Sequence, residues 1–208
     1  MSLKNELSKF WDWAGITFAE YCEGATPPKA RQAEWEGEYP NWNKLEDETK
    51  ILIQMEGDCN DSSEMQLLLQ VLALDNESES VKEWILDEVR DEDLICRIGK
   101  AGLESNSGHS RWLSIDLVRR CPAEERQAIL RRVWESEKDS YVKRRALLVL
   151  FELDDPMNEK NAIEALSSND EYIRLVAHRY LRKIGKGGEF FKLALEDPSE
   201  LIRKDAIE

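Results

Sequence analysis

Hydrophobic positions in the second half of the chain keep a fixed offset from an acidic or small polar residue. After Asp139, a β-branched residue follows three positions later, a base four later, Ala seven later and Leu eleven later. The same order starts at Asp170, and a third copy starts at Ser199. Offsets of 3, 7 and 11 place the apolar residues on one stripe of an α-helix, and a small central residue lets a neighbouring helix pack closely. The pattern therefore predicts three helices of one kind, each opened by a residue suited to the N-cap.

Two weaker copies of this pattern lie upstream, at residues 81–89 and 114–118. The central positions of all five copies are 29, 32, 31 and 29 residues apart, at Ile85, Ser114, Ala146, Ala177 and Ala206. Shorter amphipathic segments separate the copies, at residues 64–74, 122–134, 158–166 and 188–195. We expect each short helix to pair with the repeat helix that follows it. No long run alternates in the manner of a β-strand, so the predicted fold class is all-α.

The repeat also resembles a known family. The segments DSYVKRRALLVLFELDDP, DEYIRLVAHRYLRKIG and DPSELIRKDAI are similar to the second halves of HEAT or armadillo-type repeats. The resemblance covers about residues 76–208 and is closest from residue 137 onward. It implies a right-handed α-solenoid of HEAT-like helical hairpins over residues 61–208, in which the base at offset four is a structural partner of neighbouring acids.

Residues 1–60 differ from the repeats because they hold four of the seven tryptophans. We expect a helix from Leu3 to Cys22, a turn at residues 26–28 and a loop at residues 37–43, which together cap the first repeat, since terminal repeats are atypical. An alternative is that WEGEYPNW, residues 35–42, is a binding surface, because Trp and Tyr are common interface anchors. Its candidate partner-contact residues are Trp35, Glu36, Glu38, Tyr39 and Trp42.

The net charge of -14 is unevenly distributed. Residues 1–104 hold 24 Asp and Glu against 10 Lys and Arg, whereas residues 105–208 hold 19 of each. Such an acidic half favours a basic protein surface and repels phosphates. Further candidate contacts are the acids Asp87, Glu88, Asp91, Glu92 and Asp93. They are open to a second interpretation, as solvated faces and helix starts.

The cysteines and the N-terminal segment indicate the cellular compartment of the protein. Cys22, Cys59, Cys96 and Cys121 are dispersed without a CxxC pair, which predicts free, mostly buried thiols rather than a disulfide framework or a zinc site. No stretch is apolar enough to span a membrane, and the first residues lack the pattern of a signal peptide. We therefore expect a cytoplasmic protein.

Motifs for catalysis are missing from the sequence. His109 and His178 are the only histidines, and neither a metal-ligand motif such as HExxH nor a phosphate-binding glycine loop occurs. The sequence therefore assigns no catalytic, cofactor-binding or metal-binding residue. It predicts a non-enzymatic binding protein, specifically an immunity-type inhibitor that binds a basic toxin domain through its acidic half.

Two alternatives remain open. One is a general HEAT-repeat adaptor in a protein assembly. The other is a HEAT-like enzyme acting on nucleic acid, which would use the basic clusters 119–120, 131–132 and 143–145 and a pocket lined by Trp112, Trp134, Tyr172 and an acid.

Overall fold

The structure is a computed structural model that describes residues 2–25, 35–55, 62–153 and 155–207. Within these ranges all regular secondary structure is helical, which confirms the all-α prediction. The chain forms two compact units, unit 1 (Met1–Pro122) and unit 2 (Ala123–Glu208). Residues 1–60, which we expected to cap the repeats within one continuous domain, belong to unit 1. No described helix is long and apolar enough to cross a membrane.

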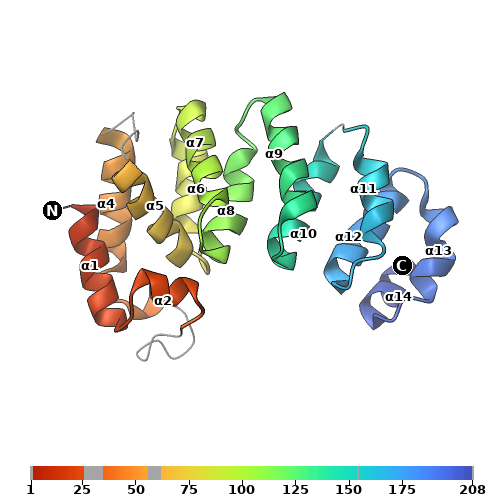
Figure 1. The fold of residues 1–208 in the computed structure, drawn as a ribbon, viewed down its shortest axis with the longest axis horizontal. Helices are drawn as coiled ribbons and strands as arrows, with labels where there is room; N and C mark the ends of the chain where they lie inside the picture. The colour runs from red at the N-terminus through yellow and green to blue at the C-terminus, as the bar shows by residue number, and fades with distance from the viewer. Residues whose placement is uncertain (1, 26–34, 56–61, 154, 208) are drawn as a thin grey trace. The chain divides into compact units, whose positions relative to one another are not determined.

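Unit 1 is arranged around one central helix, α5 (Figure 1). Its helices are α1 (Leu3–Ala14), α2 (Phe18–Cys22), α3 (Trp35–Glu38), α4 (Trp42–Met55), α5 (Ser62–Leu74), α6 (Ser80–Glu88), α7 (Glu92–Leu103) and α8 (Gly108–Val118). Helix α5 packs against α1, α4, α6, α7 and α8. Seven of its residues are buried, because a helix that is enclosed on several sides needs apolar residues on more than one face.

The expected helix from Leu3 to Cys22 is wrong, since the chain breaks between α1 and α2. Gly15 ends α1 in the left-handed conformation, with φ at 73°. Thr17 then opens α2 in a reciprocal capping box with Glu20. The expected loop at 37–43 is mostly helical, because α3 ends at Glu38 and α4 begins at Trp42. The turn expected at 26–28 lies outside the described residues.

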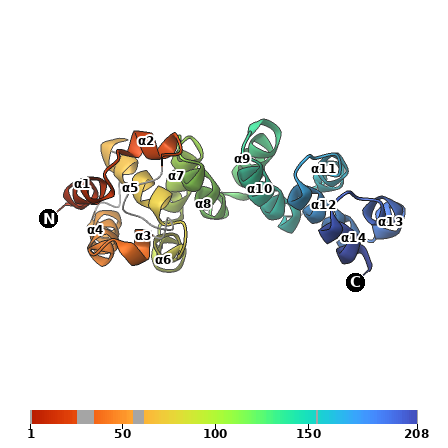
Figure 2. The ribbon, with the colours of Figure 1, turned by 90° about the horizontal axis from the view of Figure 1, so that it is seen from below.

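Unit 2 consists of three successive helix pairs. Its helices are α9 (Ala123–Ser136), α10 (Ser140–Glu152), α11 (Asn158–Ala165), α12 (Glu171–Lys183), α13 (Gly187–Leu195) and α14 (Glu200–Ile207). Each even-numbered helix packs against the odd-numbered helix before it, and α12 packs against both α10 and α14. Figure 2 shows α9, α11 and α13 in one row and α10, α12 and α14 in the other.

The fixed offsets predicted from the sequence mark the buried stripes of α10 and α12. Asp139 and Asp170 are the N-caps, and each carboxylate accepts two backbone N–H bonds. The residues at offsets 3, 7 and 11 are at most 2% exposed in both helices: Val142, Ala146, Leu150, Ile173, Ala177 and Leu181. The repeat pattern therefore identified these two helices and the faces they bury.

In α12 and α14 the base at offset four holds the turn that precedes its own helix, whereas Lys143 of α10 packs on Trp134. Arg174 Nη1 donates to the carbonyl oxygens of Ser168 and Asn169, six and five residues earlier, at 2.9 and 3.3 Å. Arg203 and Arg111 make the same pair of bonds to the residues six and five positions before them. Because helix ends leave carbonyls without intrahelical partners, these arginines have a structural role.

Arg174 also pairs with an acid of the next helix pair. Its Nε and Nη2 each lie 2.8 Å from a carboxylate oxygen of Asp197, and both side chains are largely buried. This bidentate bond lowers the pKa of Asp197, outweighing the opposite effect of burial. The interaction agrees with the expectation that offset-four bases are partners of acids.

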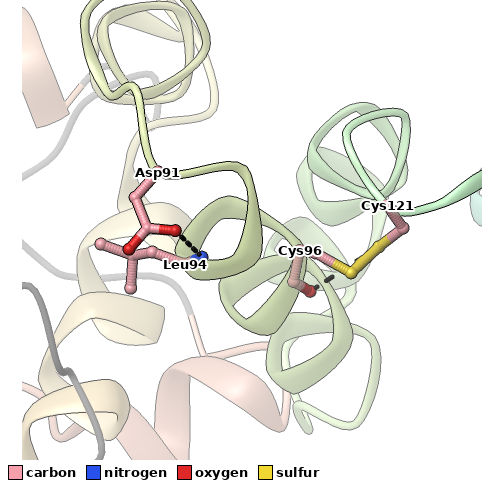
Figure 3. The surroundings of a disulfide bond; sticks show 4 residues. All are labelled: Asp91, Leu94, Cys96 and Cys121. Atoms are coloured by element: carbon pink, nitrogen blue, oxygen red, sulfur yellow. Dashed lines mark hydrogen bonds between the residues drawn. A yellow bond between two sulfur atoms is a disulfide. The ribbon is translucent and has the colours of Figure 1, made fainter.

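Two cysteines overturn the prediction of free thiols. Cys96 of α7 and Cys121, three residues after α8, form a disulfide with an S–S distance of 2.09 Å (Figure 3). Helices α7 and α8 approach closely because Gly102 faces Ser114, where an added Cβ would lie 1.8 Å from the serine oxygen. The fold thereby joins residues 25 apart in the sequence. Cys22 is free, and Cys59 lies outside the described residues.

Candidate functional site

The aromatic side chains of WEGEYPNW are buried rather than displayed. Trp35, Tyr39 and Trp42 are 2, 4 and 6% exposed. Phe10 of α1, which is fully buried, makes edge contacts with Trp35 and Tyr39 at centroid distances of 5.9 and 5.2 Å. Their burial favours the packing role that the sequence left open, and it removes these three side chains from the accessible surface of unit 1.

The two acids of the same segment are half-buried. The Glu36 carboxylate accepts backbone N–H bonds from Glu77 and Ser78, at 3.2 and 2.9 Å. Burial raises its pKa, although the two hydrogen bonds act in the opposite direction. Glu36 therefore fixes the segment before α6 from the distant helix α3. Glu38 of the same helix is partly accessible.

The remaining five predicted contacts gather where α6 ends and α7 begins. Asp87 and Glu88 end α6, Asp91 is the N-cap of α7, and Glu92 and Asp93 form its first turn. All five side chains are exposed. We call them the α6–α7 acidic surface. The structure thus brings these five together on unit 1, whereas the aromatic candidates lie in its core.

Helix α7, which the sequence pattern missed, accounts for part of this surface. The Asp91 carboxylate accepts the Leu94 N–H at 3.0 Å (Figure 3), and acids in a first turn favour the helix dipole. Glu92 lies 3.8 Å from Arg120 Nη1. An Asp followed by two acids and an apolar pair was the signal that could have predicted the start of α7.

Asp87 and Glu88 have no such explanation. They lie in the last turn of α6, where negative charge opposes the helix dipole. Neither makes a hydrogen bond or ion pair with any residue that the structure describes. Local structure therefore does not account for these two acids.

A buried carboxylate that the sequence did not single out lies at the other end of α6. The Asp75 Oδ2 atom accepts the backbone N–H groups of Val81 and Lys82, both at 2.9 Å. Burial raises the pKa of Asp75 to about 7. Asp75 replaces the missing cap of α6, because Glu79 at the N-cap position has a left-handed backbone and makes no capping bond.

The basic clusters considered for phosphate binding are largely engaged within the protein. In unit 2, Arg131 pairs with the Asp155 carboxylate at 2.6 Å, and Lys143 Nζ lies 4.6 Å from the centre of the Trp134 ring. In unit 1, Arg120 donates to the Leu86 carbonyl oxygen at 2.8 Å. These side chains stabilise the fold, which weakens the case for a phosphate-binding ridge.

The aromatic pocket expected of an enzyme does not match a pocket that the described part of unit 2 forms. Trp134 is 5% exposed and packs in the core, as does Trp112 in unit 1. A pocket of about 460 Å³ lies among α12, α13 and α14 and is lined by other residues, including His178 and Asp205. Asp205 is held by arginines at 2.5 and 3.1 Å, and burial lowers the pKa of His178.

Metal chemistry gains no support from the described part of the chain, where no three His, Cys, Asp or Glu side chains gather in an arrangement that could hold a metal ion. Comparisons with protein-family models, curated proteins and solved structures found no match. Function must therefore be inferred from the surfaces of the two units.

Proposed function

We propose that the chain is a non-enzymatic binding protein of the immunity type, which inhibits a basic toxin domain through the α6–α7 acidic surface of unit 1. The observation that carries this proposal is the pair Asp87 and Glu88. Both are exposed, unpaired among the described residues and placed where they oppose the dipole of α6. A basic protein surface that approaches these two negative charges interacts with them favourably.

The scaffold in this proposal is a right-handed α-solenoid of HEAT-like hairpins with residues 1–60 as its cap. Support comes from the recurring N-cap Asp and offset-four Arg of unit 2, and from the same arginine contact in α8. Stacked repeats present side chains from successive helices on one face, which suits binding of a macromolecule.

A cytoplasmic location is part of the same proposal. Cytosolic reductants keep most thiols reduced, so the Cys96–Cys121 bond would form there only transiently. Alkylation of thiols in freshly lysed source cells, followed by mass spectrometry, reports the redox state of the pair. A fully oxidised pair in all of the protein would contradict a cytoplasmic location.

The binding proposal is tested with two variants of equal charge. Asp87→Lys with Glu88→Lys changes the α6–α7 acidic surface, and Glu135→Lys with Glu164→Lys is the matched control in unit 2. All four residues are exposed and lie in the last turn of a helix, where lysine favours the dipole. Both variants change the net charge by the same amount.

Tagged proteins are used to capture partners from nuclease-treated lysate of the natural source, and the Kd of the purified partner is then measured. We expect one stoichiometric basic protein, bound at least about tenfold more weakly by the α6–α7 variant and nearly unchanged by the control. Equal weakening by both variants would reject the proposed surface. Several unrelated partners would favour an adaptor, and retention of nucleic acid alone in a parallel capture without nuclease would favour the enzyme alternative.

A further inference from the structure

Two exposed tyrosines occupy the same position in successive repeat helices of unit 2. Tyr141 and Tyr172 each lie two residues after the N-cap Asp of their helix and are 40 and 46% exposed. Each donates its backbone N–H to the Oδ1 atom of that Asp at 2.9 Å. Because α10 and α12 pack against each other, the shared local geometry brings the two rings to one side of the unit.

Arg144 of α10 lies between these rings. Its guanidinium carbon is 4.6 Å from the centre of the Tyr141 ring and 4.8 Å from that of the Tyr172 ring. A guanidinium between two aromatic faces is held by cation–π and stacking interactions, which order the long side chain without using its N–H groups.

The hydrogen-bonding groups of Arg144 are unused within the described structure. Among the described residues Arg144 has no hydrogen-bond or ion-pair partner. Burial acts to raise the pKa of the nearby Asp170, but the hydrogen bond from Ser140, two backbone N–H groups and, to a smaller extent, the charge of Arg144 lower it. The neighbouring bases differ, since Lys143 lies over Trp134 and Arg174 is bound to Asp197. Arg144 is therefore an ordered cation with open donors.

We propose that Tyr141, Arg144 and Tyr172 form a docking site for an acidic side chain of a protein partner. Arginine offers a planar fork of donors that matches a carboxylate, and Tyr and Arg are enriched among residues that dominate binding energy. The stacked position of Arg144 reduces the entropy lost when the partner binds. The site lies on unit 2 and does not depend on the α6–α7 acidic surface.

A carboxylate fits this site better than a nucleic acid does. Tight binding of a polyanion needs several phosphate contacts, whereas this cluster offers one open guanidinium. Residues 123–208 carry 18 Asp and Glu against 16 Lys and Arg, so unit 2 lacks the positive field that attracts nucleic acid. One acidic residue beside apolar side chains matches both the fork and the exposed rings.

The site is tested with a phage-displayed library of random dodecapeptides, selected on the immobilised full chain. Peptides are then measured by fluorescence polarisation against the wild type, Arg144→Gln, Tyr172→Leu and Lys160→Gln. Lys160 is an exposed base of α11 and serves as the control, because its replacement removes the same charge elsewhere in unit 2. Thermal unfolding confirms that each variant is folded.

We expect the enriched peptides to share an Asp or Glu whose amide replacement weakens binding at least about tenfold. Arg144→Gln should weaken it to a similar degree, Tyr172→Leu by less, and Lys160→Gln hardly at all. The proposal is overturned when no peptide is enriched, or when enriched peptides bind Arg144→Gln as well as the wild type. Tighter binding of a labelled oligothymidine that is lost in Arg144→Gln would also overturn it, in favour of nucleic acid.

Discussion

The two units reach stable helical packing by different means. Unit 2 repeats one local plan: an N-cap Asp opens α10 and α12, small and aliphatic residues fill one stripe of each of these helices, and an arginine holds the turn before α12 and before α14. Unit 1 encloses α5 among five other helices and adds an aromatic core around Phe10, together with a disulfide. Local rules therefore describe most of unit 2, whereas long-range contacts dominate unit 1.

The two units also differ in the groups that compensate the charge of a buried carboxylate. In unit 2 the Asp197 carboxylate has an arginine partner, whose bidentate bond lowers its pKa. In unit 1 Asp75 receives backbone N–H groups instead, and burial raises its pKa to about 7. A full opposite charge compensates for the loss of water, whereas neutral donors, here two backbone N–H groups and the Ser80 hydroxyl, do so only in part.

The largest expected effect separates the aromatic core of unit 1 from the exposed aromatics of unit 2. Phe10→Ala should lower the free energy of unfolding by about 4 kcal/mol, because it leaves a cavity at a fully buried position. Phe191→Ala removes the same side chain where it is 47% exposed and should cost less than about 1 kcal/mol. Urea unfolding followed by circular dichroism measures both, and equal losses would contradict the contrast.

The second prediction concerns the disulfide of unit 1. Reduction should lower the free energy of unfolding by about 3 kcal/mol, because the bond closes a loop of 25 residues in the unfolded chain. The measurement compares urea midpoints with and without dithiothreitol in a Cys22→Ser background. Cys96→Ser with Cys121→Ser should unfold like the reduced protein and ignore the reductant. A reductant effect that persists in this double variant would assign the loss to another cause.

The third prediction uses the raised pKa of Asp75. Between pH 4 and 7 the folded state binds a proton that the unfolded state has released, so stability falls as pH rises through this range and levels off above it. Asp75→Asn keeps a hydrogen-bond acceptor without the charge. The free energy of unfolding of this variant, relative to that of the wild type, should therefore rise by about 2 kcal/mol between pH 5 and 8. Urea titrations at each pH measure the difference.

Asp197 provides the opposite case for the same urea titrations. Its pKa is lowered in the folded state, so its contribution is complete above its unfolded pKa and is lost as pH falls through the folded value. Asp197→Asn should therefore destabilise most at neutral pH and least in acid. Parallel pH profiles for the Asp75 and Asp197 variants would show that the two acids do not differ as described.

The smallest expected effect tests whether caps act alike in both units. Asp91→Ala in α7 and Asp139→Ala in α10 should each cost about 1 kcal/mol, since each leaves backbone N–H groups without an acceptor. Asp139→Asn is the control and should lose little, because asparagine is also a good cap. Losses that differ several-fold between the two units would show that cap energies depend on tertiary context here.

The sequence by itself determined the fold class and the repeat helices of unit 2. Asp139 and Asp170 marked the N-caps, and the offsets identified the buried stripes, because capping and helical periodicity act over a few residues. The sequence also indicated five of the exposed acids, since a charged side chain is rarely buried. It missed α7 and joined α1 to α2, where single residues decide the breaks.

Tertiary structure decided the features that depend on residues far apart in the chain. Whether Trp35 is buried depends on Phe10, and the cap of α6 comes from Asp75 rather than from the residue before the helix. Packing of α7 on α8 placed Cys96 beside Cys121, and packing of α10 on α12 placed Arg144 over two tyrosine rings. Residue type and spacing show what a side chain is able to do, but its partners depend on which helices the fold brings together.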